Sequence, residues 1–325
     1  MITSERPAIA SRPRNFVTVA ELRPGELRSL LDLTGRVKRD PDVIRGRLAG
    51  RRVGMLLDKP STRTRVSFES AAWALGMLPI VLHPDELQLG RGESVGDTAR
   101  ALSLYLDALA VRTSKHSRLQ ALAEAATVPV INALTDDHDP CQALADIFTI
   151  EEEFGTFGGI QVAFIGDGGN VCQSLIQAAA AVGLELRVAT PRFYEPAPAI
   201  VDQARKVAAE TGGSIYLTND PDEGVFGAEV VYADVWTSMG RERERAARDL
   251  AFRGFIVDER LMGLASASAI FLHCLPARRG EEVSEAVIDG PASRVWQQAA
   301  NRLYADTALL YWLVTGDMTG ERLLR

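Results

Sequence analysis

Segment 61–65 of the chain consists of three hydroxyl and two guanidinium side chains. The segment follows the apolar run 53–57, which is typical of a buried strand, and precedes a helical pattern over 66–75. At a helix start, free backbone N–H groups, the positive end of the helix dipole and a bidentate guanidinium together favour a bound phosphoryl group. The alternative is a helix cap beside two surface arginines. The predicted donors are Ser61, Thr62, Arg63 and Thr64.

Three further motifs follow this segment in a defined order. They are Asp139-Pro140-Cys141-Gln142, the loop from Asp234 to Gly240, and His273-Cys274-Leu275-Pro276. In this order the four motifs resemble those of the aspartate/ornithine carbamoyltransferase family, and the resemblance runs from about residue 15 to about residue 318. The loop and the last turn are similar to those of the ornithine enzymes rather than the aspartate enzymes.

The composition argues against several classes of protein. The chain has 325 residues, 46% of them hydrophobic and 24% charged, so two domains of ordinary size are expected rather than a small binding module. A formal net charge of −7 argues against nucleic acid or an anionic membrane surface as a partner. No apolar run reaches the roughly 18 residues of a membrane span. The three cysteines lack metal-ligand spacing, which favours a reducing cytoplasm and no metal site.

Strand and helix patterns alternate from residue 17 onward, which predicts an α/β fold with two doubly wound parallel-sheet domains. The expected strands are 53–57, 78–82, 108–112, 128–132, 161–167, 185–189, 230–232 and 269–272, and the expected early helices are 22–37, 66–75, 97–105 and 119–125. A helix from 140 to about 154 should connect two domains, at 1–150 and 151–292. The resemblance implies that the first binds carbamoyl phosphate and the second binds the amino acid ornithine. The resemblance implies that the C-terminal helix, within 293–325, packs back on the first domain.

Polar residues follow several of the predicted strands. In parallel sheets of this kind, ligands lie beyond the carboxyl ends of the strands. The residues concerned are Ser61, Arg112, Asn170, Asp234 and Cys274. Their positions place the active site in the cleft between the two domains, independently of any family.

The resemblance implies carbamoyl phosphate as one substrate. This ligand carries two negative charges and a carbonyl, so it needs donors around the phosphoryl group and separate polarisation of the carbonyl oxygen. Without the family, Arg112 would be interpreted as a salt-bridging surface residue and Arg302 as helix surface. The resemblance implies that Gln88 reaches the ligand from a neighbouring subunit of a homotrimer. The complete implied set is Ser61, Thr62, Arg63, Thr64, Gln88, Arg112, Asp139, Gln142, Cys274, Leu275 and Arg302, with the backbone carbonyls of Cys274 and Leu275 accepting from the carbamoyl NH₂.

The second substrate implied by the resemblance is the side-chain amine of L-ornithine. Direct attack of the amine on the carbonyl gives a tetrahedral intermediate and then L-citrulline and phosphate, and it requires neither a cofactor nor a metal. The implied catalytic residues are Arg63, Asp234 and Cys274. The implied ornithine-binding residues are Asn170, Asp234, Ser238 and Met239. From the residues alone, Asp234 would be a turn cap, Met239 a core residue and Cys274 a packing residue.

The chain departs from the family pattern at Asp139, where the family has a His that donates to the carbonyl oxygen. Loss of such a donor typically costs about a hundredfold or more in rate. The neighbouring His138 could replace it if the loop is rotated, or Asp139 could itself be protonated in a dry site. Two alternatives therefore stay open, a carbamoyltransferase for another amine and a non-catalytic binding homologue. The glycine-rich run 166–169 suggests a nicotinamide dehydrogenase, but it lacks the third glycine and the ribose-binding acid.

Overall fold

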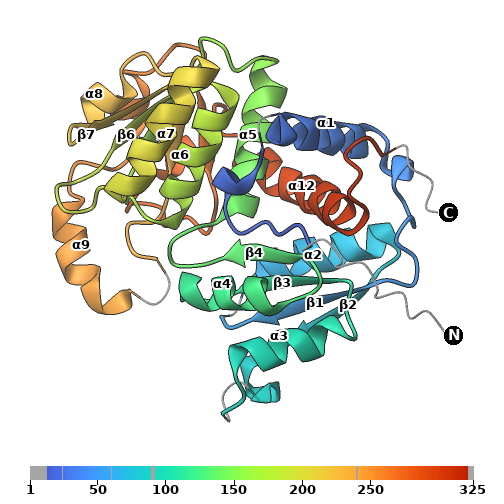
Figure 1. Ribbon diagram of the computed structural model, residues 1–325. Coiled ribbons are helices and arrows are strands. Elements are labelled where there is room, and N and C mark those ends of the chain that lie inside the picture. Colours follow the sequence, from blue (N-terminus) through green and yellow to red (C-terminus); the bar gives the residue numbers. More distant parts are fainter. Residues whose placement is uncertain (1–12, 24, 60, 89–91, 239–240, 321–325) are drawn as a thin grey trace, which may run out of the picture.

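The computed structural model describes residues 13–23, 25–59, 61–88, 92–238 and 241–320. These residues form two α/β units, each built around its own parallel sheet (Figure 1). The predicted fold class is therefore confirmed. Among the described residues, no helix is both long enough and apolar enough to cross a lipid bilayer.

The first unit contains a four-stranded parallel sheet in the order β2-β1-β3-β4. The strands are β1 (Arg52–Leu57), β2 (Leu78–Leu82), β3 (Ala108–Arg112) and β4 (Val130–Leu134). The helices are α1 (Glu26–Arg39), α2 (Thr62–Leu75), α3 (Val95–Ser103), α4 (His116–Ala125) and α5 (Pro140–Phe154). Helix α2 starts four residues before its predicted start because Ser61 caps it, its side chain accepting from the Thr64 N–H at 3.3 Å.

The second unit contains a five-stranded parallel sheet in the order β7-β6-β5-β8-β9. The strands are β5 (Gln161–Ile165), β6 (Glu185–Ala189), β7 (Ser214–Thr218), β8 (Val230–Ala233) and β9 (Ile270–His273). The helices are α6 (Asn170–Val182), α7 (Pro198–Thr211), α8 (Pro221–Val225), α9 (Arg245–Ala251), α10 (Glu259–Met262) and α11 (Glu285–Ile288), and the last helix of the chain, α12 (Val295–Thr315), follows them. The edge strand β7 was not among the predicted strands.

The glycine-rich turn after β5 has a packing role. A Cβ atom on Gly168 would lie 2.3 Å from the backbone nitrogen of Pro196, so only glycine lets the turn approach the 194–196 segment this closely. Close backbone packing accounts for this glycine without a dinucleotide.

The long helix α12 joins the C-terminal part of the chain to the first unit. It packs against α1, α2 and α5 and lies beside them in Figure 1. The units are also linked where β4 leads into α5: the Asp139 N–H donates to Ser174 Oγ at 2.8 Å, and Asn170 Nδ2 donates to the Thr135 carbonyl at 2.7 Å. These contacts hold the carboxyl ends of the two sheets toward one cavity.

Candidate active site

A cavity of about 650 Å³ lies between the carboxyl ends of the two sheets. Its lining includes most of the residues predicted from the sequence, namely Ser61, Thr62, Arg63, Thr64, Arg112, Asp139, Gln142, Asn170, Asp234, Ser238, Cys274, Leu275 and Arg302. Gln88 is exposed and does not line the cavity of its own chain. Met239 falls outside the described residues. Thus the structure brings together side chains from both units that are far apart in sequence.

One end of the cavity is formed by the start of α2 and the end of β3. Thr64 is buried, and its Oγ1 accepts a hydrogen bond from Arg112 Nη1 at 3.3 Å. The Nε atom of Arg112 is buried with no hydrogen-bond partner among the described residues. Arg112 is therefore a cavity residue rather than the surface ion-pair residue suggested by the sequence alone. Burial lowers the pKa of Arg63 and of Arg112, although both guanidinium groups keep their charge at neutral pH.

Arg302 on α12 completes this end of the cavity. It is only 8% exposed, which rules out the helix-surface alternative. Its Nη1 donates to Gln142 Oε1 at 2.7 Å, and its Nε faces the Asp306 carboxylate at 3.3 Å. The remaining nitrogen, Nη2, is buried without a hydrogen-bond partner among the described residues. Two sides of the guanidinium are thus fixed, and the third is left for a ligand.

A buried carboxylate orients these groups. Asp146 Oδ1 accepts from Gln142 Nε2 at 2.8 Å and from Gln298 Nε2 at 2.6 Å, and Asp146 Oδ2 accepts from the Tyr232 hydroxyl at 3.1 Å. Because the Gln142 amide nitrogen donates to Asp146, the amide oxygen of Gln142 faces Arg302. Gln298 Oε1 in turn accepts from the His273 N–H at 2.9 Å, so the same carboxylate also anchors β9.

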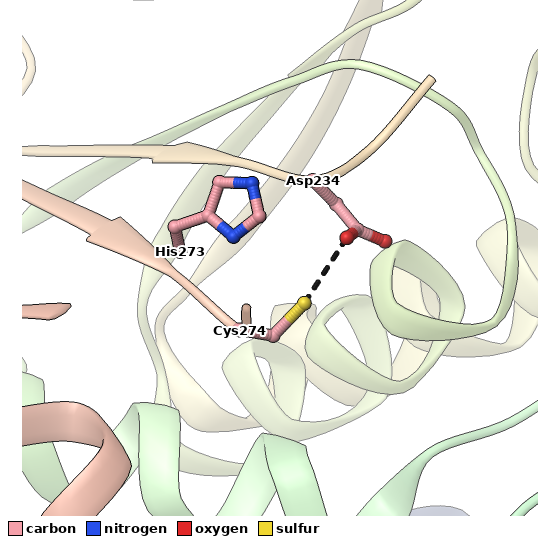
Figure 2. Close-up of side chains that lie close together, drawn as sticks. All are labelled: Asp234, His273 and Cys274. Carbon is pink, nitrogen blue, oxygen red and sulfur yellow. Dashed lines mark hydrogen bonds between the residues drawn. The ribbon is translucent and has the colours of Figure 1, made fainter. Parts of the chain in front are cut away.

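The other end of the cavity comes from the second unit and contains the buried carboxyl group of Asp234, with Arg241 and Arg278 also in the lining. Asp234 follows β8, Cys274 follows β9, and Cys274 Sγ donates to Asp234 Oδ1 at 3.0 Å, as Figure 2 shows. Burial raises the pKa of the Cys274 thiol well above its usual value, and the nearby Asp234 charge adds to this effect. Cys274 is therefore a protonated thiol that donates to Asp234, not a thiolate nucleophile.

His273 lies beside this pair in Figure 2, but its ring nitrogens have other partners. Its Nδ1 accepts from the Leu275 N–H at 2.8 Å, and its Nε2 lies 3.1 Å from Glu282 Oε1. The lone pair that would bind a metal is thus used by the backbone, so the close grouping of Asp234, His273 and Cys274 does not form a metal site.

Backbone conformation at the cavity is unusual in two places. Leu275 has φ of 57°, and Leu134 has φ of 144°, values that favour glycine. Both residues line the cavity. Such outliers persist where the surrounding structure holds them, and they concentrate at binding sites. At Leu275 the hydrogen bond to His273 holds the turn.

Several lining residues were not predicted from the sequence, among them Lys59, Ser67, Asp136, Asp167, Thr237, Arg241 and Gln298. Asp167 is held by the buried Arg248, whose Nη1 lies 3.0 Å from Asp167 Oδ2 and donates to the Trp236 carbonyl at 2.8 Å. The segment after β8 is thereby attached to the turn after β5. The position of Asp167 just after a predicted strand could have indicated a cavity residue. No sequence pattern near Asp167 indicated its partner Arg248, which lies about 80 residues later.

Two family models match the chain almost end to end. Residues 14–152 match the carbamoyl-P binding domain of aspartate/ornithine carbamoyltransferase, and residues 158–313 match its Asp/Orn binding domain. The chain belongs to the aspartate/ornithine carbamoyltransferase family.

Similar proteins include two curated relatives named ornithine carbamoyltransferase. The one from Acidothermus cellulolyticus is 48% identical over 309 residues, 95% of this chain and 98% of the relative. The one from Methanoculleus marisnigri is 45% identical over 307 residues, 94% of this chain and 98% of the relative. The solved ornithine carbamoyltransferase from Pyrococcus furiosus superposes with a TM-score of 0.89 at 45% identity, covering 94% of this chain and 98% of that one.

In this member of the aspartate/ornithine carbamoyltransferase family, Asp139 is a buried residue of the cavity wall and His138 lies outside the cavity. Asp139 caps α5, its Oδ1 accepting from the Gln142 N–H at 3.2 Å, and it is only 6% exposed. His138 does not line the cavity, and its ring centroid lies 5.0 Å from that of His116. Burial lowers the pKa of His138 to about 4, so the ring is neutral at pH 7. Because His138 does not line the cavity, it does not supply the donor that Asp139 lacks.

Proposed function

We propose that this chain transfers the carbamoyl group from carbamoyl phosphate to the side-chain amine of L-ornithine, giving L-citrulline and phosphate. The observation that carries the proposal is the charge distribution of the cavity between the two sheets. Three guanidinium groups gather at one end and the Asp234–Cys274 pair lies at the other. The names of the relatives support ornithine as the acceptor.

The phosphoryl group would bind at the start of α2. Free N–H groups and the positive end of the helix dipole favour an anion there, and Arg63 and Arg112 add charge. Arg302 Nη2 would donate to the carbonyl oxygen, where negative charge develops as the amine attacks. The remaining proposed contacts to this substrate come from Ser61, Thr62, Thr64, Gln142 and the backbone of Cys274 and Leu275.

The amine would bind at Asp234. Burial raises the pKa of this carboxyl group, and the opposing influences are His273 and the hydrogen bond from Cys274. A cationic amine would restore the charged form of Asp234, and Cys274 would keep the carboxylate oriented. Asn170, Ser238 and Met239 are proposed to hold the amino-acid head group. The ammonium must first lose a proton, because only the neutral amine attacks, and the Asp234 carboxylate beside it would accept that proton. After attack the tetrahedral intermediate expels phosphate, which would take the second proton from the nitrogen, so no covalent enzyme intermediate is needed.

We further propose a homotrimer in which Gln88 acts across an interface. Gln88 is exposed and lies outside its own cavity. Nearby α2 and the edge strand β2 expose large apolar side chains, with Trp73 at 75% and Leu78 at 58%. Mixing Gln88→Ala with Arg302→Ala subunits should restore some activity, because some sites would combine an intact Gln88 with an intact Arg302. No recovery in mixed oligomers would contradict the shared site.

The domain division proposed for this chain assigns 1–150 to carbamoyl phosphate and 151–292 to ornithine, with the C-terminal helix returning to the first part. We also propose a role in arginine biosynthesis in the cytoplasm. Support for the division comes from the matched family domains, and support for the pathway comes from the proposed product, citrulline.

The test is formation of citrulline from carbamoyl phosphate and L-ornithine by the purified chain. Putrescine, L-lysine and N-acetyl-L-ornithine serve as competing acceptors. Robust citrulline formation with little product from the other amines supports the proposal. Turnover with another amine would establish a different carbamoyltransferase, and tight carbamoyl phosphate binding without any turnover would establish a non-catalytic binding protein.

A further inference from the structure

Asp139 presents an unusual group to a cavity proposed for an anion. The residue is 6% exposed and lines the cavity, and only its Oδ1 has partners among the described residues. These partners are the Gln142 N–H at 3.2 Å and, more distantly, Arg302 Nη2 at 3.7 Å. The second oxygen, Oδ2, receives no hydrogen bond from the described residues. Oδ2 is thus an accessible carboxylate oxygen on a residue of the cavity wall, and it can accept a hydrogen bond from a donor on the ligand.

The neighbouring Arg302 provides the complementary group. Its Nη2 is a buried donor without a hydrogen-bond partner among the described residues, and its distance of 3.7 Å from Asp139 Oδ1 is too long for a hydrogen bond between them. A free donor and a free acceptor therefore lie side by side on the cavity wall. An amide presents the matching pair along one edge, because its carbonyl oxygen accepts and its N–H on the same side donates.

We propose that the carbamoyl edge of the donor substrate docks on this pair, with its carbonyl oxygen on Arg302 Nη2 and one N–H on Asp139. Asp139 is then the residue that selects a carbamoyl group over other acyl groups. The inference rests on the proposed function and assigns it a specificity determinant. The second N–H of the carbamoyl group remains for the backbone carbonyls at Cys274 and Leu275.

The surrounding charges indicate that Asp139 faces the carbamoyl group rather than the amine. Burial lowers the pKa of Arg112, and the charge of Asp139 is the largest influence opposing that shift. Asp139 therefore lies among the arginines of the phosphate end. The attacking amine has its own carboxylate at the other end, Asp234, which is bonded to Cys274.

Two phosphonates that differ in one group provide the test. Phosphonoacetamide has an NH₂ group where 2-oxopropylphosphonate has a methyl group, and both keep the carbonyl and the phosphonate. A hydrogen bond to a charged group should give the wild type a preference of about tenfold to a hundredfold for the amide by calorimetry. Equal affinities in the wild type would overturn the inference while leaving the proposed function intact.

Variants of Asp139 separate the capping role from the selecting role. Serine also caps helices, so Asp139→Ser keeps the cap of α5 but withdraws the carboxylate from the cavity. Its amide preference should fall about tenfold or more, to what the backbone carbonyls at Cys274 and Leu275 alone provide, whereas Asp139→Asn, which retains an acceptor oxygen, should keep more of the preference. An unchanged preference in Asp139→Ser would overturn the inference.

Controls distinguish the possible failures. Inorganic phosphate has no amide, so it should bind Asp139→Ser at least as tightly as the wild type and thereby report the folded fraction. The amide preference is a ratio within one protein and does not depend on that fraction. If the wild type binds neither phosphonate nor carbamoyl phosphate, the proposed function fails and this inference fails with it.

Discussion

The two ends of the cavity differ in how far the charged groups named above are already paired. At the phosphate end, Arg112 Nε and Arg302 Nη2 have no hydrogen-bond partner among the described residues. At the amine end, Asp234 and Cys274 already bond to each other, and Asp167 pairs with Arg248. The donor substrate would thus supply missing partners, whereas the amine must join an existing pair. The phosphate end is expected to provide affinity for the donor substrate and most of the rate of transfer. The amine end is expected to provide selectivity for the acceptor.

The sharpest test of this contrast is Arg63→Ala at the phosphate end. Loss of one positioned donor to the reacting group typically costs about a hundredfold to a thousandfold in kcat. We expect a loss of this size in citrulline formation. Arg65→Ala is the matched control, because Arg65 lies on the same helix but does not line the cavity and pairs with Glu69 at 2.9 Å. Similar losses in both variants would show that general charge, rather than the position of Arg63, matters.

Asp234→Asn tests the amine end with a smaller expected effect. The amide keeps the shape of the carboxyl group but loses the charge that attracts an amine. A charge-assisted hydrogen bond of this kind corresponds to a rise of about tenfold to a hundredfold in the KM for ornithine. The affinity for phosphonoacetamide should stay within about threefold of the wild type. An equal loss of both affinities would contradict the division of the cavity into two ends.

The sequence predicts those site residues best that lie in one short segment of the chain. The phosphate end starts from contiguous residues, Ser61 to Thr64, directly after a strand, so pattern alone located it. Arg302 required the family resemblance, because its burial depends on α12 packing against α2 and α5. The i,i+4 spacing of Arg302 with Asp306 was visible, but Ser67, which donates to Asp306 at 2.7 Å, lies 239 positions away. Such tertiary contacts leave no local pattern.

Most strands of the fold were also predictable from short segments. The strand that was missed and the helix start that was misplaced have physical causes. Fully buried central strands such as β1 read as continuous apolar runs. Strand β7 lies at the edge of its sheet and exposes Ser214 and Tyr216, so its apolar signal is weak. The first predicted helix began at residue 22 rather than at Glu26, because apolar residues in the preceding turn extended its pattern. Helix boundaries depend on caps, which short-range periodicity does not report.

Cys274→Ala should produce a still smaller effect at the amine end. It removes one neutral donor to Asp234 and leaves the carboxylate in place, so the KM for ornithine should rise by about threefold to tenfold. Cys172→Ala is the control, because Cys172 is buried on α6 and does not line the cavity. If Cys274→Ala instead abolished turnover, the thiol would have a direct chemical role that its raised pKa argues against.

Asp146 lies behind both ends, so its replacement tests whether they share one support. Burial raises the pKa of Asp146 to about 7, against the opposing hydrogen bonds from Gln298, Gln142 and Tyr232. The carboxyl group of an unfolded chain has a pKa of about 3.9. Between about pH 4 and pH 7 the folded protein therefore holds a proton that the unfolded chain has released, and the free energy of unfolding falls as pH rises through that window.

Asp146→Asn should remove this contribution to the pH dependence. Its free energy of unfolding should fall less steeply than that of the wild type between pH 5 and pH 7, by at most about 1.4 kcal/mol per pH unit. Urea titrations at several pH values measure both slopes, and the other buried carboxyl groups cancel in the difference. Near pH 7 the variant should also lose affinity for both phosphonoacetamide and ornithine. Asp146 holds Gln142, which accepts from Arg302, and it holds Gln298, which accepts from the His273 N–H at the end of β9. Parallel slopes, or loss of only one affinity, would mean that the two ends are supported separately.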